Sequence, residues 1–326
     1  MLYSFNDISK KINNNELLIL AGDEQLLKKL PRGTWIGGTI PYFIDKNGGV
    51  FTKDKIFVNE LPSYISNFEI KYYDEKNIEK IAIEAPENGF TFLIIPASSE
   101  IHTKYSQGAP SYEDIFMKPI IGWISGVSLD DIGKESAKVI DGTTGEISDT
   151  KAIAIHLELK LDMMANIGII NIFEQGNGDI IEFDSEGFSV EDCLVNGKKQ
   201  NFYDYITINK FDTRLPIVAN YCGAMVNVSF QSVDEKEKKV NFYAPVFKNI
   251  KYKIAAPIDN YIQEFEKAIQ YTGEKSTVLS CNCILNYLYG DLEGKRTSNF
   301  LSPITFGEIA YQLLNQTLVY LEINEF

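Results

Sequence analysis

The sequence predicts a mixed α/β protein that is rich in strands, with two packed domains whose sheets are antiparallel or mixed and carry few helices. Apolar residues recur at period two in many short runs, whereas few segments combine helical spacing with recognisable caps. With 326 residues, 44% of them hydrophobic, the chain can bury two cores. We place the domains at residues 1–165 and 166–326.

The first predicted strand, at 17–22, is followed by a short helix that Asp23 can cap at its start. The clearest strand is 151–161, where every odd position from Ile153 to Leu161 is large and apolar, so we expect it to bury one face. Further strands are predicted at 80–85, 90–96, 167–174, 226–231, 240–247, 250–256 and 317–323.

A second helix is predicted over 257–273. Its apolar residues Ile262, Phe265 and Ile269 recur at helical spacing, and Gly273 can end it. Glycine-rich turns within 138–151 predict a hairpin between two strands.

Two segments, 31–43 and 108–126, combine several glycines with aromatic residues. Glycine lets another chain segment approach closely, and Pro41 stops the first segment from continuing as a central strand. The two segments either line one ligand pocket or form core strands at a domain interface, and the sequence leaves both readings open. The candidate ligand-binding residues in them are Trp35, Gly37, Gly38, Thr39, Tyr42 and Trp123.

Further candidates lie in the second half of the chain. Asn220 and Tyr221 interrupt an apolar run at a strand end and could contribute to a ligand site. Cys281, Asn282 and Cys283 place two thiols at the end of another predicted strand. A zinc site needs four ligands, and the two other cysteines and two histidines stand at no familiar spacing, so we expect no metal.

Glu308 follows Gly307 within an otherwise apolar run. A buried carboxylate needs a defined donor, so we expect Glu308 inside the C-terminal domain, close to residues 280–283. Its partner is expected to be either backbone N–H groups of that loop or a cationic group of a ligand.

Several motifs resemble the FIST family. Two stretches resemble parts of the N-terminal FIST domain. One is "WIGGTIPYF" followed by "FTKDKIFVNEL", and the other is "MKPIIGWISG" followed by "VIDGTTGEISDTKAIAIHLEL". The C-terminal FIST domain is resembled by "IIEFDSEGFSV", "VLSCNC" and "ITFGEIAYQLLNQTLVYLEI". The chain departs from the family pattern after Cys281, where Asn282 and Cys283 stand in place of an expected arginine.

The resemblance implies a stand-alone sensory protein inside the cell that binds a small, amino-acid-like ligand and acts through a separate signalling protein. Two alternatives remain open. One is an enzyme that uses Cys281 with an acid such as Glu308, and the other is a scaffold that binds a protein. A thiol of depressed pKa that alkylates quickly would favour the enzyme.

Charge and hydropathy limit the partners and the compartment. A formal charge of −14 disfavours nucleic acid, because binding to phosphates requires clustered Lys and Arg. No apolar run is long enough to span a membrane and no signal peptide is apparent, so we expect a cytoplasmic protein with reduced cysteines. We expect no cofactor, since His102 and His156 lie outside any haem attachment motif.

Overall fold

The computed structural model describes residues 1–269, 277–296 and 300–325. Over these residues the chain forms the predicted sheet-rich, mixed α/β structure with few helices. The α-helices are α1 (Phe5–Asn13), α2 (Glu24–Leu27), α3 (Glu100–Gly108), α4 (Phe202–Ile208), α5 (Tyr261–Ile269) and α6 (Ile284–Tyr289). Short 3-10 helices are η1 (Ile78–Lys80), η2 (Ala109–Ser111) and η3 (Leu129–Asp131).

The strands form three sheets in the main body of the molecule. The first has the order β1 (Leu2–Tyr3), β6 (Ile56–Glu60), β2 (Leu18–Gly22), β3 (Trp35–Thr39), β10 (Val139–Asp141) and β11 (Ile147–Ser148). The second runs β26 (Gln312–Leu314), β25 (Glu308–Ala310), β9 (Ile120–Ser125), β8 (Gly89–Pro96), β12 (Ala152–Leu159) and β7 (Ile65–Tyr73). The third runs β13 (Met163–Ile170), β27 (Leu318–Glu325), β23 (Thr277–Cys283), β24 (Ser302–Thr305), β4 (Tyr42–Asp45) and β5 (Gly48–Phe51).

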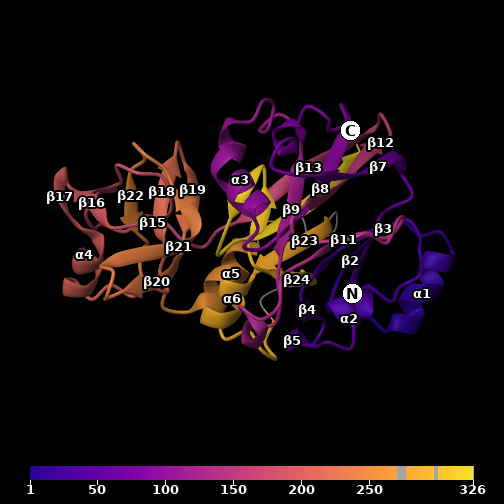
Figure 1. Cartoon of the computed structure of the whole chain (residues 1–326), viewed down its shortest axis with the longest axis horizontal. Helices are drawn as coiled ribbons and strands as arrows, with labels where there is room; N and C mark the ends of the chain where they lie inside the picture. The colour runs from indigo at the N-terminus through magenta and orange to yellow at the C-terminus, as the bar shows by residue number, and fades with distance from the viewer. Residues whose placement is uncertain (270–276, 297–299, 326) are drawn as a thin grey trace.

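Residues 181–254 form a separate lobe, drawn in orange at the left of Figure 1. One sheet of the lobe has the order β17 (Lys198–Asn201), β16 (Asp192–Val195), β14 (Ile181–Glu182), β22 (Tyr252–Ile254), β18 (Ile217–Tyr221) and β19 (Ala224–Val228). The other consists of β15 (Gly187–Val190), β21 (Lys239–Val246) and β20 (Phe230–Asp234). The chain then returns to the main body through α5.

Strands from both sides of residue 165 share two of the body sheets. β25 pairs with β9, and β24 pairs with β4, so hydrogen bonds join the first 165 residues to the last 50. Backbone pairing therefore does not separate the halves 1–165 and 166–326, and the boundary between them stays a prediction about folding units.

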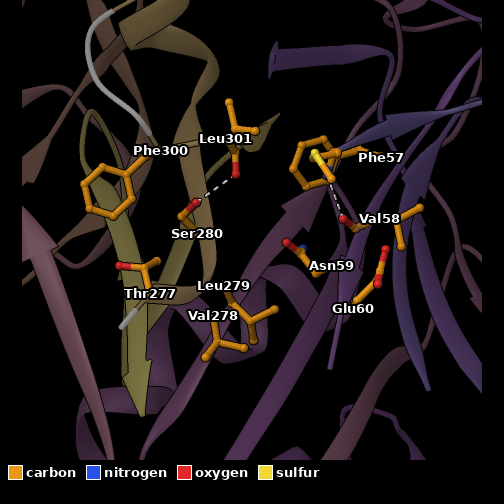
Figure 2. Close-up of a pocket in the computed structure, with 11 residues that line it drawn as sticks. Phe57, Val58, Asn59, Glu60, Thr277, Val278, Leu279, Ser280, Phe300 and Leu301 are labelled. Atoms are coloured by element: carbon orange, nitrogen blue, oxygen red, sulfur yellow. Dashed lines mark hydrogen bonds between the residues drawn. The ribbon is translucent and has the colours of Figure 1, made fainter. Parts of the chain in front are cut away.

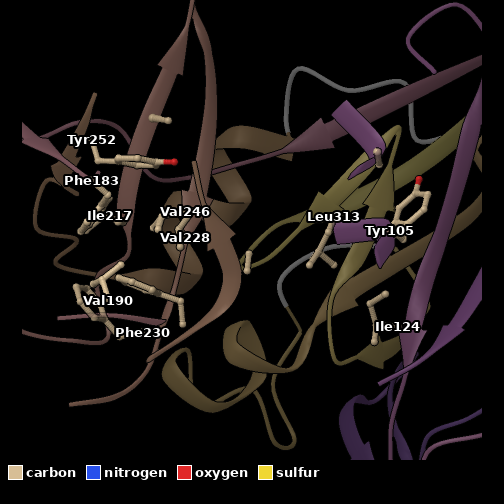
Figure 3. Packing of buried hydrophobic residues seen from close by; sticks show 14 of the residues in the cluster. Tyr105, Ile124, Phe183, Val190, Ile217, Val228, Phe230, Val246, Tyr252 and Leu313 are labelled. Atoms are coloured by element: carbon tan, nitrogen blue, oxygen red, sulfur yellow. The ribbon is translucent and has the colours of Figure 1, made fainter. Parts of the chain in front are cut away.

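Two large apolar clusters meet at β12. The expectation that this strand buries only one face is wrong, because Ala152, Ala154 and His156 are buried as well as the odd-numbered positions. β12 lies between β7 and β8, and the odd positions and the alanines enter different clusters. One of these clusters continues from Tyr105 and Leu313 in the body into the aromatic core of the lobe (Figure 3).

The prediction of a strand at 80–85 is also wrong. The segment forms η1 and turns, and the buried residues Ile78, Ile81, Ala82 and Ala85 recur at the helical spacing of three and four. The alternation in "IAIEA" is too short to distinguish the two periods, so packing against the core decided the conformation.

Both predicted helices are present, with shorter bounds. Asp23 caps α2 by accepting a hydrogen bond from Gln25 N, and α5 buries Phe265 and Ile269 as expected. The proposed end at Gly273 lies outside the described residues. No helix in the described part of the chain is long and apolar enough to cross a membrane.

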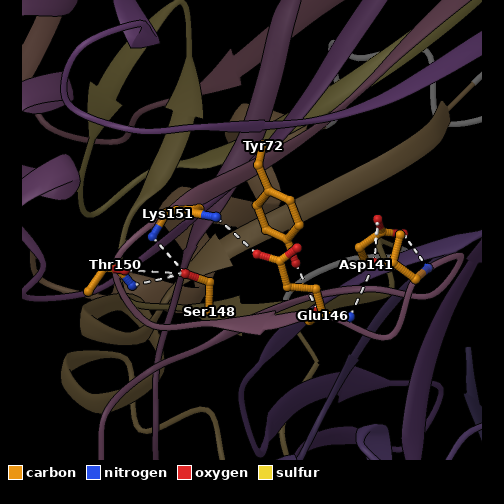
Figure 4. Close-up of polar contacts among 7 residues, drawn as sticks. Tyr72, Asp141, Glu146, Ser148, Thr150 and Lys151 are labelled. Atoms are coloured by element: carbon orange, nitrogen blue, oxygen red, sulfur yellow. Dashed lines mark hydrogen bonds and ion pairs between the residues drawn. The ribbon is translucent and has the colours of Figure 1, made fainter.

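The hairpin predicted within 138–151 is confirmed, with β10 pairing antiparallel to β11. Figure 4 shows polar contacts of this segment, among them those of Asp141 and Glu146. The buried Asp141 carboxylate organises its turn by accepting hydrogen bonds from the backbone and hydroxyl groups of Thr143 and Thr144. Tyr72 donates to the Glu146 carbonyl at 2.8 Å and so ties the hairpin to β7.

Candidate functional site

The two glycine- and aromatic-rich segments meet in the core. β3 is a central strand, and Pro41 lies where the chain leaves it for β4 in another sheet, as expected. A Cβ on Gly38 would lie 2.7 Å from Ile94 and 2.9 Å from Trp123 Nε1, so a larger residue would not fit. The residues predicted to bind a ligand here, Trp35, Gly37, Gly38, Thr39, Tyr42 and Trp123, are all buried. This arrangement matches the core-strand reading.

Asn220 and Tyr221 lie in the lobe, far along the chain from the other candidates, at the end of β18. Asn220 Oδ1 accepts a hydrogen bond from Gly223 N at 2.7 Å, which stabilises the turn into β19. Cys222 and Gly223 both adopt positive φ in that turn. The polar residues that interrupt the apolar run are therefore accounted for by a tight hairpin.

Glu308 and three other residues predicted to bind a ligand, Trp123, Cys281 and Cys283, do come together. Glu308 stands opposite Trp123 in the antiparallel pair of β25 and β9, so both side chains lie on one face. The thiol of Cys281 donates to the Gly122 carbonyl at 3.1 Å, and the thiol of Cys283 bonds the Glu308 carboxyl. Residues from both halves of the chain thus surround one buried carboxyl.

The expected burial of Glu308 is confirmed, since none of its surface is exposed. Its donors differ from those expected, because Thr317 supplies its hydroxyl at 2.8 Å and its backbone N–H at 3.4 Å. Thr305 Oγ1 lies 3.5 Å from the other carboxyl oxygen. Burial raises the pKa of Glu308 well above its usual range, and the hydrogen bonds from Thr317 and Cys283 oppose this only in part. The surroundings of the carboxyl therefore favour its neutral form over the carboxylate.

The thiols beside it do not resemble a nucleophile. Burial, and secondarily the Glu308 carboxyl, raise the pKa values of Cys281 and Cys283 well above the usual range. A nucleophilic cysteine needs the opposite shift and access to substrate. Their surroundings disfavour the thiolate that the Cys281 enzyme requires.

Thiol labelling is expected to follow exposure. Cys222 is exposed in the lobe hairpin, whereas Cys193, Cys281 and Cys283 are buried, so Cys222 should react first with 5,5′-dithiobis(2-nitrobenzoate). The fast phase should disappear in a Cys222→Ser variant and persist in a Cys281→Ser variant. Loss of the fast phase in Cys281→Ser alone would contradict this assignment.

Hydrogen bonds continue from Glu308 toward the surface. The carbonyl of Thr317 accepts from Asn286 Nδ2 at 3.0 Å, and Asn286 Oδ1 accepts from the Tyr261 hydroxyl at 2.5 Å. Gln316 also bonds the Tyr261 hydroxyl and donates to the Arg214 carbonyl at 3.0 Å. Burial raises the pKa of Tyr261 well above its usual range, so this hydroxyl keeps its proton.

A pocket of about 430 Å³ opens at the Tyr261 end of this chain. It lies between the loop at 212–215, the start of α5 and the end of α6, and Tyr261 and Tyr289 supply aromatic surface. Its charged residues are Asp212, Arg214, Asp259 and Lys295. A mixed-charge pocket with two aromatic rings, connected to a buried acid, is the best-defined candidate site.

A comparison with known protein families gives a match over nearly the whole chain. Residues 3–324 match a family of unknown function, DUF6976. This chain belongs to that family. No match was found among curated proteins.

Membership of DUF6976 corrects the resemblance to FIST domains, since no FIST domain is detected in the chain. The motifs that carried the resemblance are short strand and turn patterns. "WIGGTIPYF" owes its glycines to the close packing at Gly38, and "VIDGTTGEISDTK" is the hairpin organised by Asp141. Such patterns recur wherever sheets and tight turns are built, so they do not identify a family.

The sequence reasoning missed the residues at the mouth of the candidate site. Tyr261 lies in a predicted helix but was not predicted to bind a ligand, and neither Arg214 nor Gln316 was among the predicted site residues. One available signal was Asn286, a polar residue inside the apolar run "CILNYLY". It is fully buried, and a buried amide requires partners.

Proposed function

We propose that the protein binds a small zwitterionic molecule, an amino-acid-like ligand, in the pocket at the start of α5. The observation that carries the proposal is the hydrogen-bonded chain that runs from the pocket at Tyr261 to the buried Glu308 carboxyl. Polar groups buried this completely are costly unless every member has a partner. The chain of bonds holds the Tyr261 ring in one orientation at the pocket.

The charges of the pocket suit a ligand that carries both signs. Arg214 forms an ion pair with Asp212 at 2.6 Å on the rim, and Lys295 forms one with Asp291 at 2.5 Å. Both pairs are exposed, so exchanging a protein carboxylate for a ligand carboxylate costs little. Asp259 has no cationic partner within the described residues, and its carboxylate can bind an ammonium group.

The helix adds to the recognition of an anionic group. Asn260 caps the start of α5, its side chain accepting from Gln263 N at 3.1 Å and its carbonyl from Glu264 N at 3.1 Å. Asn260, Tyr261 and Ile262, at the start of α5, line the pocket, and the dipole of a helix favours a carboxylate near its N-terminus.

A calorimetric titration with the standard amino acids, followed by their amides and N-acetyl derivatives, tests this proposal. At least one free amino acid should bind, and blocking either charged group should weaken binding about tenfold, the usual effect of losing one charge-assisted hydrogen bond. Arg214→Gln and Asp259→Asn should each weaken binding about as much.

The matched control is Asp192→Asn, which removes an exposed carboxylate of the lobe that pairs with Lys199. This variant should bind as the unaltered protein does. Equal affinity for free and doubly blocked amino acids, or no effect of either pocket variant, would contradict the proposal.

A further inference from the structure

A second pocket, of about 340 Å³, lies between β6 and the beginning of β23 (Figure 2). Apolar side chains of Phe57, Leu279, Phe300 and Leu301 form much of its wall. The Ser280 hydroxyl donates to the Leu301 carbonyl at 3.0 Å, which holds the segment at 300–301 against β23. This pocket is separate from the one at Tyr261, because the two have no lining residue in common.

Asn59 is an unusual residue for this wall. Its side chain is only 7% exposed and lies on the same face of the sheet as the core residues Phe57 and Ile19. Among the described residues, its amide nitrogen Nδ2 has no hydrogen-bond partner. A buried donor left without a partner destabilises the folded protein, so an apolar residue would be more stable here if the position were only structural.

Thr277 presents a second unused group on the facing wall. It begins β23, and its hydroxyl is enclosed with no partner in the described part of the chain. Figure 2 shows Asn59 and Thr277 on opposite sides of the pocket, on β6 and β23. The pocket therefore offers an amide donor on one wall and a hydroxyl, which can donate or accept, on the other.

The charges around the pocket favour a neutral ligand. Glu60 is the one lining residue with an ionisable side chain, and its carboxylate already bonds Lys11 at 3.0 Å and the Tyr3 hydroxyl at 3.1 Å. The amino group of Met1 also lines the pocket, but it already donates to the Val58 carbonyl at 2.8 Å, and burial lowers its pKa to about 6, which disfavours the charged form that would bind an anion. Walls that combine apolar side chains with a few hydrogen-bonding groups are typical of sites for small molecules.

We propose that this pocket binds a neutral aromatic amide, that is, a flat ring carrying a carbonyl oxygen and an N–H group. The carbonyl accepts from Asn59 Nδ2, and the N–H donates to Thr277 Oγ1. The terminal amide torsion of asparagine is soft, so a small rotation turns the enclosed N–H toward the ligand. The ring lies against Phe57 and the apolar residues around it.

Benzamide is the probe, tested on the full chain by saturation-transfer NMR and by titration of its affinity. Benzoate has the same ring with an anionic head and should bind at least tenfold more weakly. Asn59→Leu keeps the side-chain volume similar and removes the donor, so it should weaken benzamide binding about tenfold. Thr277→Val should weaken benzamide binding severalfold, and this variant tests the proposal if the Asn59→Leu protein does not fold.

The matched control is Asn67→Leu, which makes the same change at an exposed position of β7 and should leave benzamide binding unaltered. Benzoate binding as tightly as benzamide would overturn the proposal. So would unchanged benzamide affinity in both pocket variants, or no benzamide binding to the unaltered protein. Amino-acid binding at the Tyr261 pocket should be unaffected by Asn59→Leu, which separates this proposal from the preceding one.

Discussion

Replacement of Gly122 by alanine is expected to lower the free energy of unfolding by about 3 kcal/mol or more, the upper range for overpacking a core. A Cβ at Gly122 would lie 1.7 Å from the Leu93 carbonyl oxygen and 2.7 Å from its carbon. Gly122 and Leu93 are partners in the parallel pair of β9 and β8, so the methyl group would force these strands apart. The next residue is Trp123, opposite Glu308, so the candidate site would be disturbed as well.

Urea unfolding followed by tryptophan fluorescence measures this effect. Gly178→Ala is the matched control, because a Cβ there meets no atom within 4 Å and its φ is not in the left-handed region. The control should unfold within about 0.5 kcal/mol of the unaltered protein, as for most surface changes. A Gly122→Ala protein as stable as the control would show that β8 and β9 are not packed as described.

Replacement of Glu308 by glutamine is expected to stabilise the protein increasingly as the pH rises. The folded-state pKa of Glu308 is raised, so between its unfolded value near 4.5 and the folded value the unfolded chain binds fewer protons. Stability then falls with rising pH, by about 1.4 kcal/mol for each pH unit. Glutamine mimics the neutral acid and carries no such penalty, so the stability difference between variant and unaltered protein should grow from pH 5 to pH 8.

Urea unfolding at several pH values tests this expectation. His156, whose pKa burial lowers to about 4, contributes the opposite slope, since stability is lost as the pH falls below the ordinary histidine value. It is present in both proteins and cancels in their difference. The exposed Glu113→Gln variant is the control and should show no pH-dependent difference. A difference that stays constant from pH 5 to pH 8 for Glu308→Gln would mean that this carboxyl is ionised in the folded protein.

Local pattern predicted much of the fold. The strand at β12 followed from alternating apolar residues, α2 from its capping aspartate, and the hairpin at β10 and β11 from glycine-rich turns. Each of these depends on neighbours within a few residues, which the sequence displays directly. The burial of Glu308 could be predicted for the same reason, because its apolar neighbours place it in the core.

Tertiary structure decided everything that depends on contacts between distant segments. Only strand pairing places Glu308 opposite Trp123, and only the return of the chain from the lobe brings Tyr261 and Arg214 to one pocket. The backbone N–H that reaches Glu308 comes from Thr317, whereas residues 280–283 contribute the Cys283 thiol and not the backbone groups expected, because the fold determines which backbone groups remain available. The sequence by itself determined that the carboxyl needed a partner, since desolvation is a property of the residue and its neighbours. Which partner meets it depends on the path of the whole chain, and that path is set by the sum of many weak contacts.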